Sequence, residues 1–342
     1  MKYLSIIIPS YNMEMFLPRA IDSIINCKHL HDIEVVVIND GSNDSTSMIG
    51  HKYADRYVGD VFIIDKSNGN YGSCINEGLK HITGKYVKVL DADDYLDTTN
   101  LDLVIDALLN TDVDMLVTPF CKVDNDNKKY MLRHITLSPY RDYSIDKLEK
   151  SKDILGIWMH EIIYKRRMLL EMNYLQTPGI SYTDMEWVFI PLLRVKTVRY
   201  LPYVLYYYQT GRIGQTVDPS IHRKKYNDEI TVTLSMAKAL SKNRDCQTSA
   251  KAYNLLLRKI MKRQKTIYRQ VLVAYQEYDN KELRSLTYWI KENNPDLFLH
   301  LMNMKLSVPL FPFPFVKWWY VGNKNRRFHY MVNLFRRYKH IT

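Results

Sequence analysis

Short β-rich runs alternate with helix-compatible stretches through the first hundred residues, and this rhythm limits the fold more than any other feature of the chain. The runs cover residues 3–8, 33–39, 61–65 and 86–90, with 115–118 as a further candidate. Strands separated by helices are expected to pair in parallel, because a parallel pair needs a long crossover connection. We therefore predict an α/β fold with a mostly parallel sheet flanked by helices.

Polar motifs follow four of these runs directly. Because ligands bind beyond the carboxyl ends of the strands in an open parallel sheet, the motifs are predicted to line one site. They are Pro9-Ser10-Tyr11-Asn12, Asp40-Gly41-Ser42, Asn68-Gly69-Asn70-Tyr71-Gly72 and Asp91-Ala92-Asp93-Asp94.

Asp91 and Asp93 are the candidate metal ligands. Side chains two residues apart in extended backbone point to the same side, so these two carboxylates can converge on one ion. Hard oxygen ligands suit Mg²⁺ or Mn²⁺, which bind through carboxylates together with substrate phosphates. An isolated motif of this kind would favour an acidic turn before a helix. Its position after the fourth predicted strand favours the metal site instead.

Two other motifs are candidates for nucleotide binding. The Asp40 carboxylate can accept a hydrogen bond from a base or a ribose, although an Asx-turn role explains this residue equally well when it is taken alone. The backbone N–H groups of the loop Asn68-Gly69-Asn70 can line a phosphate pocket, and an ordinary turn is the alternative. A typical NAD-binding site is excluded because no GxGxxG motif follows the first strand.

The four motifs together resemble the family 2 glycosyltransferases, which have the GT-A fold. The resemblance covers residues 3–120 closely, continues more loosely to about residue 215, and departs from the family at Asn39, where Asp is common. It rests on Ile8-Pro9-Ser10-Tyr11-Asn12, Asn39-Asp40-Gly41-Ser42-Asn43-Asp44-Ser45-Thr46, Asn68-Gly69-Asn70 and Leu90-Asp91-Ala92-Asp93-Asp94.

This resemblance implies an inverting glycosyltransferase of the bacterial cell-surface polysaccharide type that uses a nucleotide-diphosphate sugar, with UDP as the expected nucleotide. It assigns Asp93 and Asp91 to Mn²⁺ or Mg²⁺. We expect transfer of one sugar per encounter to a glycan or a polyprenyl-diphosphate-linked acceptor, because the QxxRW motif of processive members is missing from the sequence. The residues implied in donor binding are Pro9, Tyr11, Asn12, Asp40, Asn68, Gly69, Asn70 and Asp91.

An inverting transfer needs a general base for the acceptor hydroxyl, and the family supplies it from an acidic pair at the start of a helix. The matching segment here is Thr183-Asp184-Met185-Glu186. A capping box between Thr183 and Glu186 would turn Glu186 back toward the backbone. Asp184 is therefore the predicted base and Glu186 the second candidate. The alternative for Asp184 is that it only complements the helix dipole.

Three further residues are candidates through the same resemblance. Arg212 lies in the loop after a Tyr-rich predicted strand at 198–208, where a basic residue can close over the diphosphate. A solvated loop arginine is the alternative. Trp158 and His160 lie where family members often place acceptor-side residues, although aromatic side chains and lone histidines more often belong to the core.

Charge and periodicity divide the chain near Pro219. From Ile221 onward there are 24 Lys and Arg against 8 Asp and Glu, whereas the residues before it hold 24 against 29. Helical spacing of apolar residues also begins after Pro219. We predict a GT-A domain over residues 1–219, with a donor half over about 1–120 and an acceptor half over about 121–219. A helical, basic region is predicted over 220–342.

The basic region is predicted to have an anionic partner. Aromatic residues at 306–320, followed by Lys and Arg, suit the headgroup layer of an anionic membrane, and three prolines there argue against a regular helix. Packing on the catalytic domain or on a second copy in a homo-oligomer is the alternative. Because no stretch is long and apolar enough to span a bilayer, we expect a cytoplasmic protein, with the inner face of the cell membrane as the candidate contact.

Other functions fit the sequence less well. A nucleotidyltransferase would need a glycine- and basic-rich loop after the first strand, and Pro9-Ser10-Tyr11-Asn12 does not provide it. A non-catalytic nucleotide-sugar or carbohydrate-binding protein is the other alternative, which the retained acidic residues disfavour. Nucleic-acid binding by the basic tail is a third alternative, but a nucleic-acid partner is not expected.

Overall fold

The computed structural model describes residues 2–211, 215, 218–243, 248–308, 311–322 and 326–339. The chain forms two compact units, Met1–Ile221 and His222–Thr342. Arg212, one of the predicted donor-binding residues, lies outside the described residues. Within the described parts of the chain, no helix has the length and apolar character needed to cross a membrane.

The first unit contains an eight-stranded sheet in the order β3-β2-β1-β4-β10-β6-β11-β9 and a four-stranded sheet in the order β5-β12-β7-β8. The strands of the larger sheet are β1 (Leu4–Ser10), β2 (Ile33–Asn39), β3 (Val61–Asp65), β4 (Tyr86–Val89), β6 (Met115–Val117), β9 (Asp142–Ser144), β10 (Ile162–Lys165) and β11 (Thr197–Tyr200). Those of the smaller sheet are β5 (Tyr95–Leu96), β7 (Phe120–Val123), β8 (Lys129–Met131) and β12 (Tyr206–Gln209).

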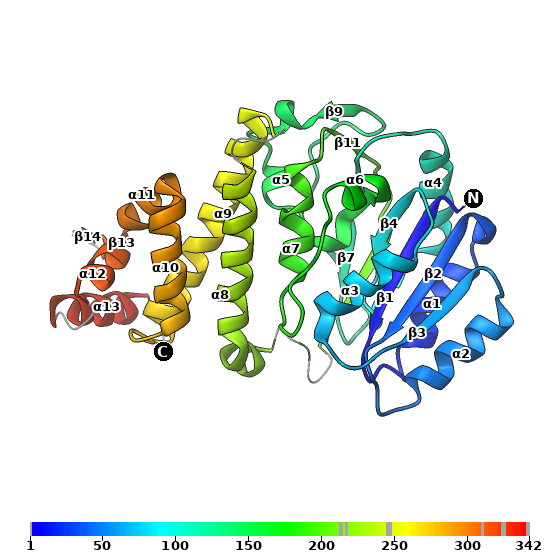
Figure 1. Ribbon diagram of the computed structural model, residues 1–342, viewed down its shortest axis with the longest axis horizontal. Coiled ribbons are helices and arrows are strands. Elements are labelled where there is room, and N and C mark those ends of the chain that lie inside the picture. Colours follow the sequence, from blue (N-terminus) through cyan, green and yellow to red (C-terminus); the bar gives the residue numbers. More distant parts are fainter. Residues whose placement is uncertain are drawn as a thin grey trace. The chain divides into compact units, whose positions relative to one another are not determined.

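Helices connect and cover these strands (Figure 1). The α-helices of the first unit are α1 (Leu17–Ile25), α2 (Thr46–Arg56), α3 (Asn70–His81), α4 (Thr98–Leu109), α5 (Lys152–Leu155), α6 (Arg166–Glu171) and α7 (Asp184–Phe189). Its 3₁₀ turns are η1 (Leu30–Asp32), η2 (Ile145–Leu148), η3 (Met159–Glu161) and η4 (Pro191–Leu193).

Parallel pairing joins β1 to both β2 and β4, and β2 to β3. Only β10 and β9 run against their neighbours in the large sheet. The predicted α/β fold with a mostly parallel sheet is confirmed. As a result, the ends of β1, β2, β3 and β4 lie along one edge, where the four polar motifs begin.

Both faces of this part of the sheet are buried, which explains the unbroken apolar runs in the sequence. Ile6 and Ile8 of β1 belong to a core cluster that includes Ile21 of α1. Ile7 faces the other way, toward α3. At Gly78 of α3, a Cβ atom would lie 2.7 Å from Cγ2 of Ile7, so the absence of a side chain lets the helix approach the sheet closely.

Two predicted strands differ from the observed ones. β1 continues through Pro9 to Ser10, and its pairing with β4 has already ended at Ile7, so the missing N–H of Pro9 leaves no ladder bond unmade. The single strand predicted at 198–208 is wrong. It is two strands, β11 and β12, which belong to different sheets and are separated by a segment that contains Pro202.

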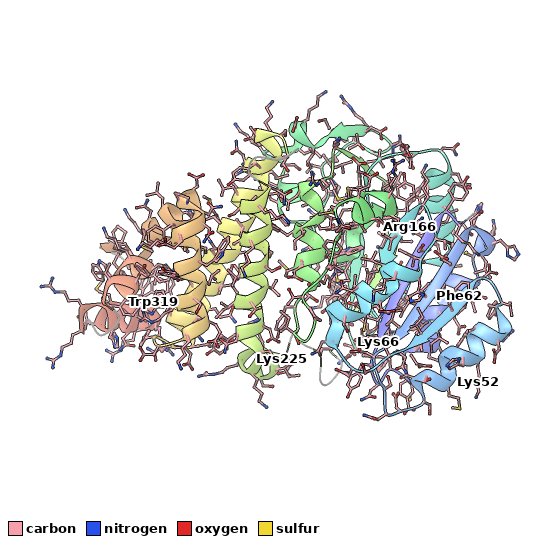
Figure 2. The ribbon with its side chains drawn as sticks, viewed as in Figure 1. Lys52, Phe62, Lys66, Arg166, Lys225 and Trp319 are labelled. Atoms are coloured by element: carbon pink, nitrogen blue, oxygen red, sulfur yellow. The ribbon has the colours of Figure 1, made fainter. Side chains whose placement is uncertain are left out.

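The second unit is helical, as predicted. Its elements are α8 (Pro219–Lys242), α9 (Ala250–Arg269), the π-helical turn η5 (Gln270–Ala274), α10 (Lys281–Asn293), α11 (Pro295–Asn303), β13 (Leu306–Val308), β14 (Phe311–Phe313), α12 (Phe315–Gly322) and α13 (Arg326–Tyr338). Trp319, labelled in Figure 2, is buried there and its Nε1 donates a hydrogen bond to the Tyr278 carbonyl at 2.7 Å.

The expectation that prolines exclude a regular helix from the aromatic segment of this unit is wrong in part. The strands β13 and β14 form a short antiparallel pair, in which Pro312 lies opposite Ser307. Helix α12 then begins at Phe315, directly after Pro314. Proline interrupts a helix only in its interior, so a proline just before the first turn is compatible with a helix that follows.

Candidate active site

The loops that follow β1 and β2 are held together by side chains of the predicted site. The backbone N–H of Asn12 donates to Oγ of Ser42 at 2.9 Å, and the N–H of Asn43 donates to Oδ1 of Asn12 at 2.9 Å. Asn12 adopts a left-handed backbone conformation with φ 54°, which asparagine tolerates better than most residues. The predicted residue Tyr11, next to it, is exposed at the same sheet edge.

Asn39 ties the second loop to the third strand. Its Nδ2 donates to Oδ1 of Asp65 at 2.7 Å, and its Oδ1 accepts from the N–H of Ser42 at 3.2 Å. An aspartate at this position could not donate to Asp65 and would place two carboxylates together. The departure from the family at Asn39 therefore has a local physical reason in the presence of Asp65.

Asp40 is almost fully buried, with 3% of its surface exposed, and its carboxylate has specific partners. Oδ1 accepts from the backbone N–H of Gly69 at 2.9 Å and from Nζ of Lys66 at 2.5 Å. Nδ2 of Asn68 donates to the Asp40 carbonyl at 3.0 Å. The structure thus brings together Asp40 and the loop Asn68-Gly69-Asn70, which the sequence analysis had treated as separate motifs.

Lys66 is a candidate site residue that the sequence motifs did not single out. It directly follows β3, beside the loop that leads into α3 (Figure 2). Besides its ion pair with Asp40, its Nζ donates to Oγ of Ser73 at 2.9 Å and to the Ser67 carbonyl at 2.6 Å. Its position at a strand end was the available signal, because the same rule selected Asp40 and Asp91.

The acidic motif after β4 is held by tyrosines from distant parts of the chain. The Tyr71 hydroxyl donates to Oδ1 of Asp91 at 2.8 Å. The Tyr206 hydroxyl donates to Oδ2 of Asp94 at 2.5 Å and accepts from the N–H of Asp91 at 3.2 Å. Oδ1 of Asp94 also accepts from the N–H of Gln209 at 2.7 Å.

These carboxylates lie close enough to perturb one another. Burial raises the pKa of Asp91, and the charges of Asp93 and Asp184 raise it further. Burial also raises the pKa of Asp94 well above its usual range, with added repulsion from Asp91 and Asp93. A group of acids that disfavour one another's charge in this way would be stabilised by a bound cation.

His160 completes the group of possible ligands. One ligand atom each of Asp91, Asp94 and His160 lies within 4.8 Å of the others. Only 5% of His160 is exposed, and its Nδ1 has no hydrogen-bond partner among the residues that the structure describes. Asp93 is outside this group. Its Oδ2 accepts from Nε2 of Gln215 at 3.4 Å, and its role as a metal ligand stays a prediction.

A buried lysine lies below the acidic motif. Lys88 of β4 is fully buried, its Nζ donates to the His160 carbonyl at 2.8 Å and lies 5.2 Å from the centre of the Tyr206 ring. Burial lowers the pKa of Lys88 to about 7, against the opposing charge of Glu161. Burial, with a contribution from Lys88, lowers the pKa of His160 to about 3. His160 is therefore neutral near pH 7, and one of its ring nitrogens has a lone pair that can bind a cation.

Aromatic rings surround His160 and reach the surface at Trp158. The imidazole lies 4.7 Å from the Tyr208 ring and 4.9 Å from the Phe120 ring, centre to centre, in stacked arrangements. Trp158 is 46% exposed and lies 5.8 Å from Phe120. The two residues that were singled out for the acceptor side therefore differ: His160 is in the interior and Trp158 is exposed.

The predicted base Asp184 is the first residue of α7, and its charge contributes to the raised pKa of Asp91. Glu186 is fully buried. Its Oε2 accepts from the N–H of Thr177 and its Oε1 from Oγ1 of the same residue, both at 2.7 Å. The predicted capping box is wrong, because the Thr183 side chain makes no cap hydrogen bond and Glu186 binds Thr177 instead.

The segment before α7 is attached to the donor half through α3. Nδ2 of Asn76 donates to the Gln176 carbonyl at 2.9 Å, and Oδ1 of Asn76 accepts from the N–H of Gln176 at 2.8 Å. At Gly72 a Cβ atom would lie 2.5 Å from the Thr177 carbonyl oxygen. Only glycine allows this close approach, which sets α7 beside the strand ends.

Comparison with known sequences decides the family. Residues 5–172 match the model of the family described as Glycosyl transferase family 2. Residues 5–172 belong to glycosyltransferase family 2. The matched residues contain the predicted metal ligands and every predicted donor-binding residue except Arg212.

Relatives of this glycosyltransferase include two proteins of Bacillus subtilis. The uncharacterized glycosyltransferase EpsJ is 26% identical over 185 residues, which is 53% of this chain and 53% of EpsJ. The minor teichoic acid biosynthesis protein GgaB is 36% identical over 102 residues, which is 30% of this chain and 11% of GgaB. The matched region covers about half of EpsJ and a small part of GgaB.

A solved structure shares the fold of the glycosyltransferase over nearly its whole length. Staphylococcus aureus TarS 1–349 superimposes with a TM-score of 0.73 at 16% sequence identity, covering 99% of this chain and 92% of that one. A second crystal structure of TarS 1–349, in complex with UDP-GlcNAc, has a TM-score of 0.71 at 17% identity. At these identities the comparison establishes the fold.

The family implies a divalent cation, and the residues of the acidic motif fit one. Asp94 is buried, Asp91 is partly buried, and the charge of Asp91 contributes to the raised pKa of Asp94. A ring nitrogen of His160 lies near both carboxylates, and its Nδ1 has no hydrogen-bond partner among the described residues. Carboxylates are the ligands that Mg²⁺ and Mn²⁺ favour. A cation held here would lie at the strand end where the diphosphate of a donor is expected.

Proposed function

We propose that this chain transfers a single sugar, with inversion, from a UDP-sugar to a glycan or lipid-linked acceptor of a bacterial surface polymer. The observation that carries this proposal is the meeting, at one sheet edge, of the Asp40–Lys66 pair, the acidic motif after β4 and Asp184. Membership of glycosyltransferase family 2 supports the reaction class. The UDP-GlcNAc complex of TarS, which has the same fold, supports UDP as the nucleotide.

Donor recognition is assigned to the ends of β1, β2 and β3. Asp40 is fixed by Gly69 and Lys66, so its carboxylate is held in place before a ligand arrives. A carboxylate fixed in this way can accept a hydrogen bond from the N–H of a uracil ring. Exposed Tyr11, after β1, offers an aromatic face for the base.

Asp91 and Asp93 are proposed to hold Mn²⁺ or Mg²⁺. When bound, the cation supplies Lewis-acid stabilisation of the negative charge on the departing nucleoside diphosphate. The protein's contribution is to fix the carboxylate of Asp91 through the Tyr71 hydroxyl and that of the neighbouring Asp94 through the Tyr206 hydroxyl. These contacts orient the oxygens in advance, so little reorganisation is needed during the reaction.

Asp184 is proposed to accept the proton of the acceptor hydroxyl. The hydroxyl oxygen forms a bond to the anomeric carbon while the bond from that carbon to the diphosphate oxygen breaks, and the electron pair leaves with the diphosphate. Attack from the face opposite the leaving group inverts the configuration. Glu186 remains the second candidate, although both of its oxygens already accept hydrogen bonds from Thr177.

The acceptor class is proposed from the relatives. GgaB is described as a minor teichoic acid biosynthesis protein, which supports a surface polymer or its lipid-linked precursor as the acceptor. Exposed Trp158 near the acidic motif can stack on a sugar ring of such an acceptor, because aromatic faces pack well against apolar sugar surfaces.

A calorimetric binding screen of UDP-, GDP- and dTDP-sugars, each with and without Mn²⁺, tests the proposed function. We expect UDP-sugars to bind most tightly and only weakly without the cation. No nucleotide binding at all, or an affinity that is the same with and without Mn²⁺, would contradict the proposal. Incubation of the best donor with candidate acceptors then identifies the product by mass spectrometry.

Replacing Lys66 by methionine is expected to weaken UDP binding on the order of 10- to 100-fold, because the charge-assisted hydrogen bond that fixes Asp40 is lost and such bonds contribute about 1.5–3 kcal/mol. Methionine has a similar length but removes the charge that holds Asp40. Isothermal calorimetry with UDP measures the change. The control is Lys52→Met, the same substitution on α2 (Figure 2). Equal affinities of the two variants for UDP would show that Lys66 does not contribute to the donor site.

Peripheral membrane contact through α13 is a further part of this proposal. Its buried face carries Phe328, Val332 and Phe335. The opposite stripe presents Arg326, Tyr330, Leu334 and Arg337, and Tyr330 is 67% exposed. Basic residues attract an anionic bilayer by about 1 kcal/mol each, and the aromatic ring suits the headgroup layer.

Reversing two charges on this stripe, in the variant Arg326→Glu with Arg337→Glu, is expected to abolish co-sedimentation with vesicles that contain anionic lipid. The control variant, Lys262→Glu with Lys265→Glu on α9, changes the net charge equally at other exposed positions. It should retain more binding than the α13 variant. If both variants co-sediment equally, or if the wild-type chain does not co-sediment with the vesicles, the α13 contact does not exist.

A further inference from the structure

A buried histidine belongs to the candidate cation site although it is not part of the acidic motif Asp91-Ala92-Asp93-Asp94. His160 lies in η3 (Met159–Glu161), far in sequence from the acidic residues after β4. The fold brings it to them because β10, which follows η3, pairs with β4. One of its ring nitrogens falls within 4.8 Å of a carboxylate oxygen of Asp91 and of one of Asp94.

The described residues around His160 do not provide a hydrogen-bond partner for Nδ1 of its imidazole ring. The residue is 5% exposed, and Nδ1 lacks a hydrogen-bond partner among the described residues. Its ring neighbours are aromatic, namely Tyr206, Tyr208 and Phe120. A buried polar atom without a partner costs free energy, so its retention beside two carboxylates calls for an explanation. A ligand between these groups supplies one.

We propose that His160 is a nitrogen ligand of the divalent cation, which it binds together with Asp91 and Asp94. This inference rests on the proposed function, because it concerns the cation that serves the UDP-sugar. It adds a ligand from η3 to those that the sequence motif suggested. It also shifts the ion toward Asp94, whereas the motif alone would pair Asp91 with Asp93.

The geometry is compatible with a single ion after a small movement. Octahedral ligands of Mg²⁺ at about 2.1 Å are about 3 Å apart when cis and about 4.2 Å apart when trans, so atoms that lie within 4.8 Å of one another must approach by up to about 2 Å, which side-chain rotation can supply. Each oxygen of Asp94 accepts one hydrogen bond, Oδ1 from the N–H of Gln209 and Oδ2 from the Tyr206 hydroxyl. Because a carboxylate oxygen has a second lone pair, either oxygen can still bind a cation.

A hydrogen bond to the backbone carbonyl of His160 holds this residue in position. Nζ of Lys88 donates to this carbonyl at 2.8 Å, and Lys88 comes from β4, the same strand that leads into Asp91. The histidine and the carboxylates are therefore attached to one rigid element. A site built in this way has its ligands in place before the ion binds.

A nitrogen ligand has two measurable consequences. It produces ¹⁴N modulation in the pulsed EPR spectrum of bound Mn²⁺, which carboxylates and water cannot produce. It also favours Mn²⁺ over Mg²⁺, because Mg²⁺ takes oxygen ligands almost exclusively. Both can be measured on the full chain with UDP present and no acceptor.

The test compares wild type, His160→Asn and the control His51→Asn, each loaded with Mn²⁺ and UDP. His51 is exposed on α2 and bonded to Asp65, so its replacement leaves the acidic motif unchanged. We expect ¹⁴N modulation in wild type and His51→Asn and its loss in His160→Asn. We also expect Mn²⁺ affinity to fall on the order of 10- to 100-fold in His160→Asn alone.

The result that overturns the inference is bound Mn²⁺ without ¹⁴N modulation in wild type, or modulation that persists in His160→Asn. If His160→Asn does not fold, wild type labelled with ¹⁵N-histidine decides, because the modulation must change from that of ¹⁴N to that of ¹⁵N. UDP binding in the same samples separates the two proposals. A chain that binds UDP and Mn²⁺ without a nitrogen ligand disproves this inference only, whereas no UDP binding disproves the proposed function as well.

Discussion

Replacing Asp184 by asparagine is expected to lower the turnover number of sugar transfer by about 10²–10⁴-fold, which is the usual contribution of a general base. Asparagine keeps the size of the side chain and its place at the start of α7 but cannot accept the proton of the acceptor hydroxyl. The affinity for the UDP-sugar should change little, because the base acts on the acceptor. Steady-state kinetics and calorimetry measure the two quantities.

Glu186→Gln provides the comparison for this prediction. Glu186 accepts two hydrogen bonds from Thr177, and glutamine has only one acceptor oxygen, so the variant should mainly lose stability. Thermal unfolding would show a lower midpoint with turnover largely preserved. Full activity of Asp184→Asn, with loss of turnover in Glu186→Gln, would move the base to Glu186.

Removing divalent cations with EDTA is expected to reduce sugar transfer by two to three orders of magnitude. Lewis-acid stabilisation of the leaving diphosphate amounts to several kcal/mol, and each 1.36 kcal/mol corresponds to about a tenfold change in rate. Addition of excess Mn²⁺ should restore the rate, which shows that the loss is not due to unfolding. Asp91→Asn should reproduce the effect in the presence of Mn²⁺.

Transfer that continues undiminished in EDTA would contradict the role of the acidic motif. The variant Asp93→Asn refines the test. Under the motif-based assignment it should weaken Mn²⁺ binding as strongly as Asp91→Asn does. Under the assignment to Asp91, Asp94 and His160, the effect of Asp93→Asn should be smaller, because Asp93 lies outside that group.

Strand-end reasoning predicted that the motifs assigned to the donor side lie at one edge of the sheet. The positions of Asp40, the Asn68 loop and Asp91 follow from apolar runs that must be buried and from the rule that parallel strands end at one edge. The hydrogen bond from Gly69 to Asp40 confirms that two of these motifs meet. Lys66 satisfied the same rule and was missed, because a lysine after an edge strand is ordinarily solvated.

Local reasoning failed where a distant partner was available. The capping-box pattern of Thr183 and Glu186 is a sound local signal, but Thr177 supplies two donors to the Glu186 carboxylate. The apolar and tyrosine-rich run at 198–208 has β-forming residues on both sides of Pro202, yet its two ends pair with different strands. In both cases tertiary contacts outweigh a local preference of about 1 kcal/mol or less.

The sequence by itself determined the α/β fold, the edge at which the site lies and the acidic residues there, because periodicity and motif order depend only on neighbours along the chain. Tertiary structure alone decided which side chains reach those acids. Tyr206, His160 and Asp184 come from β12, η3 and α7, and their positions depend on strand pairing and on the close approach at Gly72. Contacts between distant segments leave no periodic signal, so only the folded chain shows them.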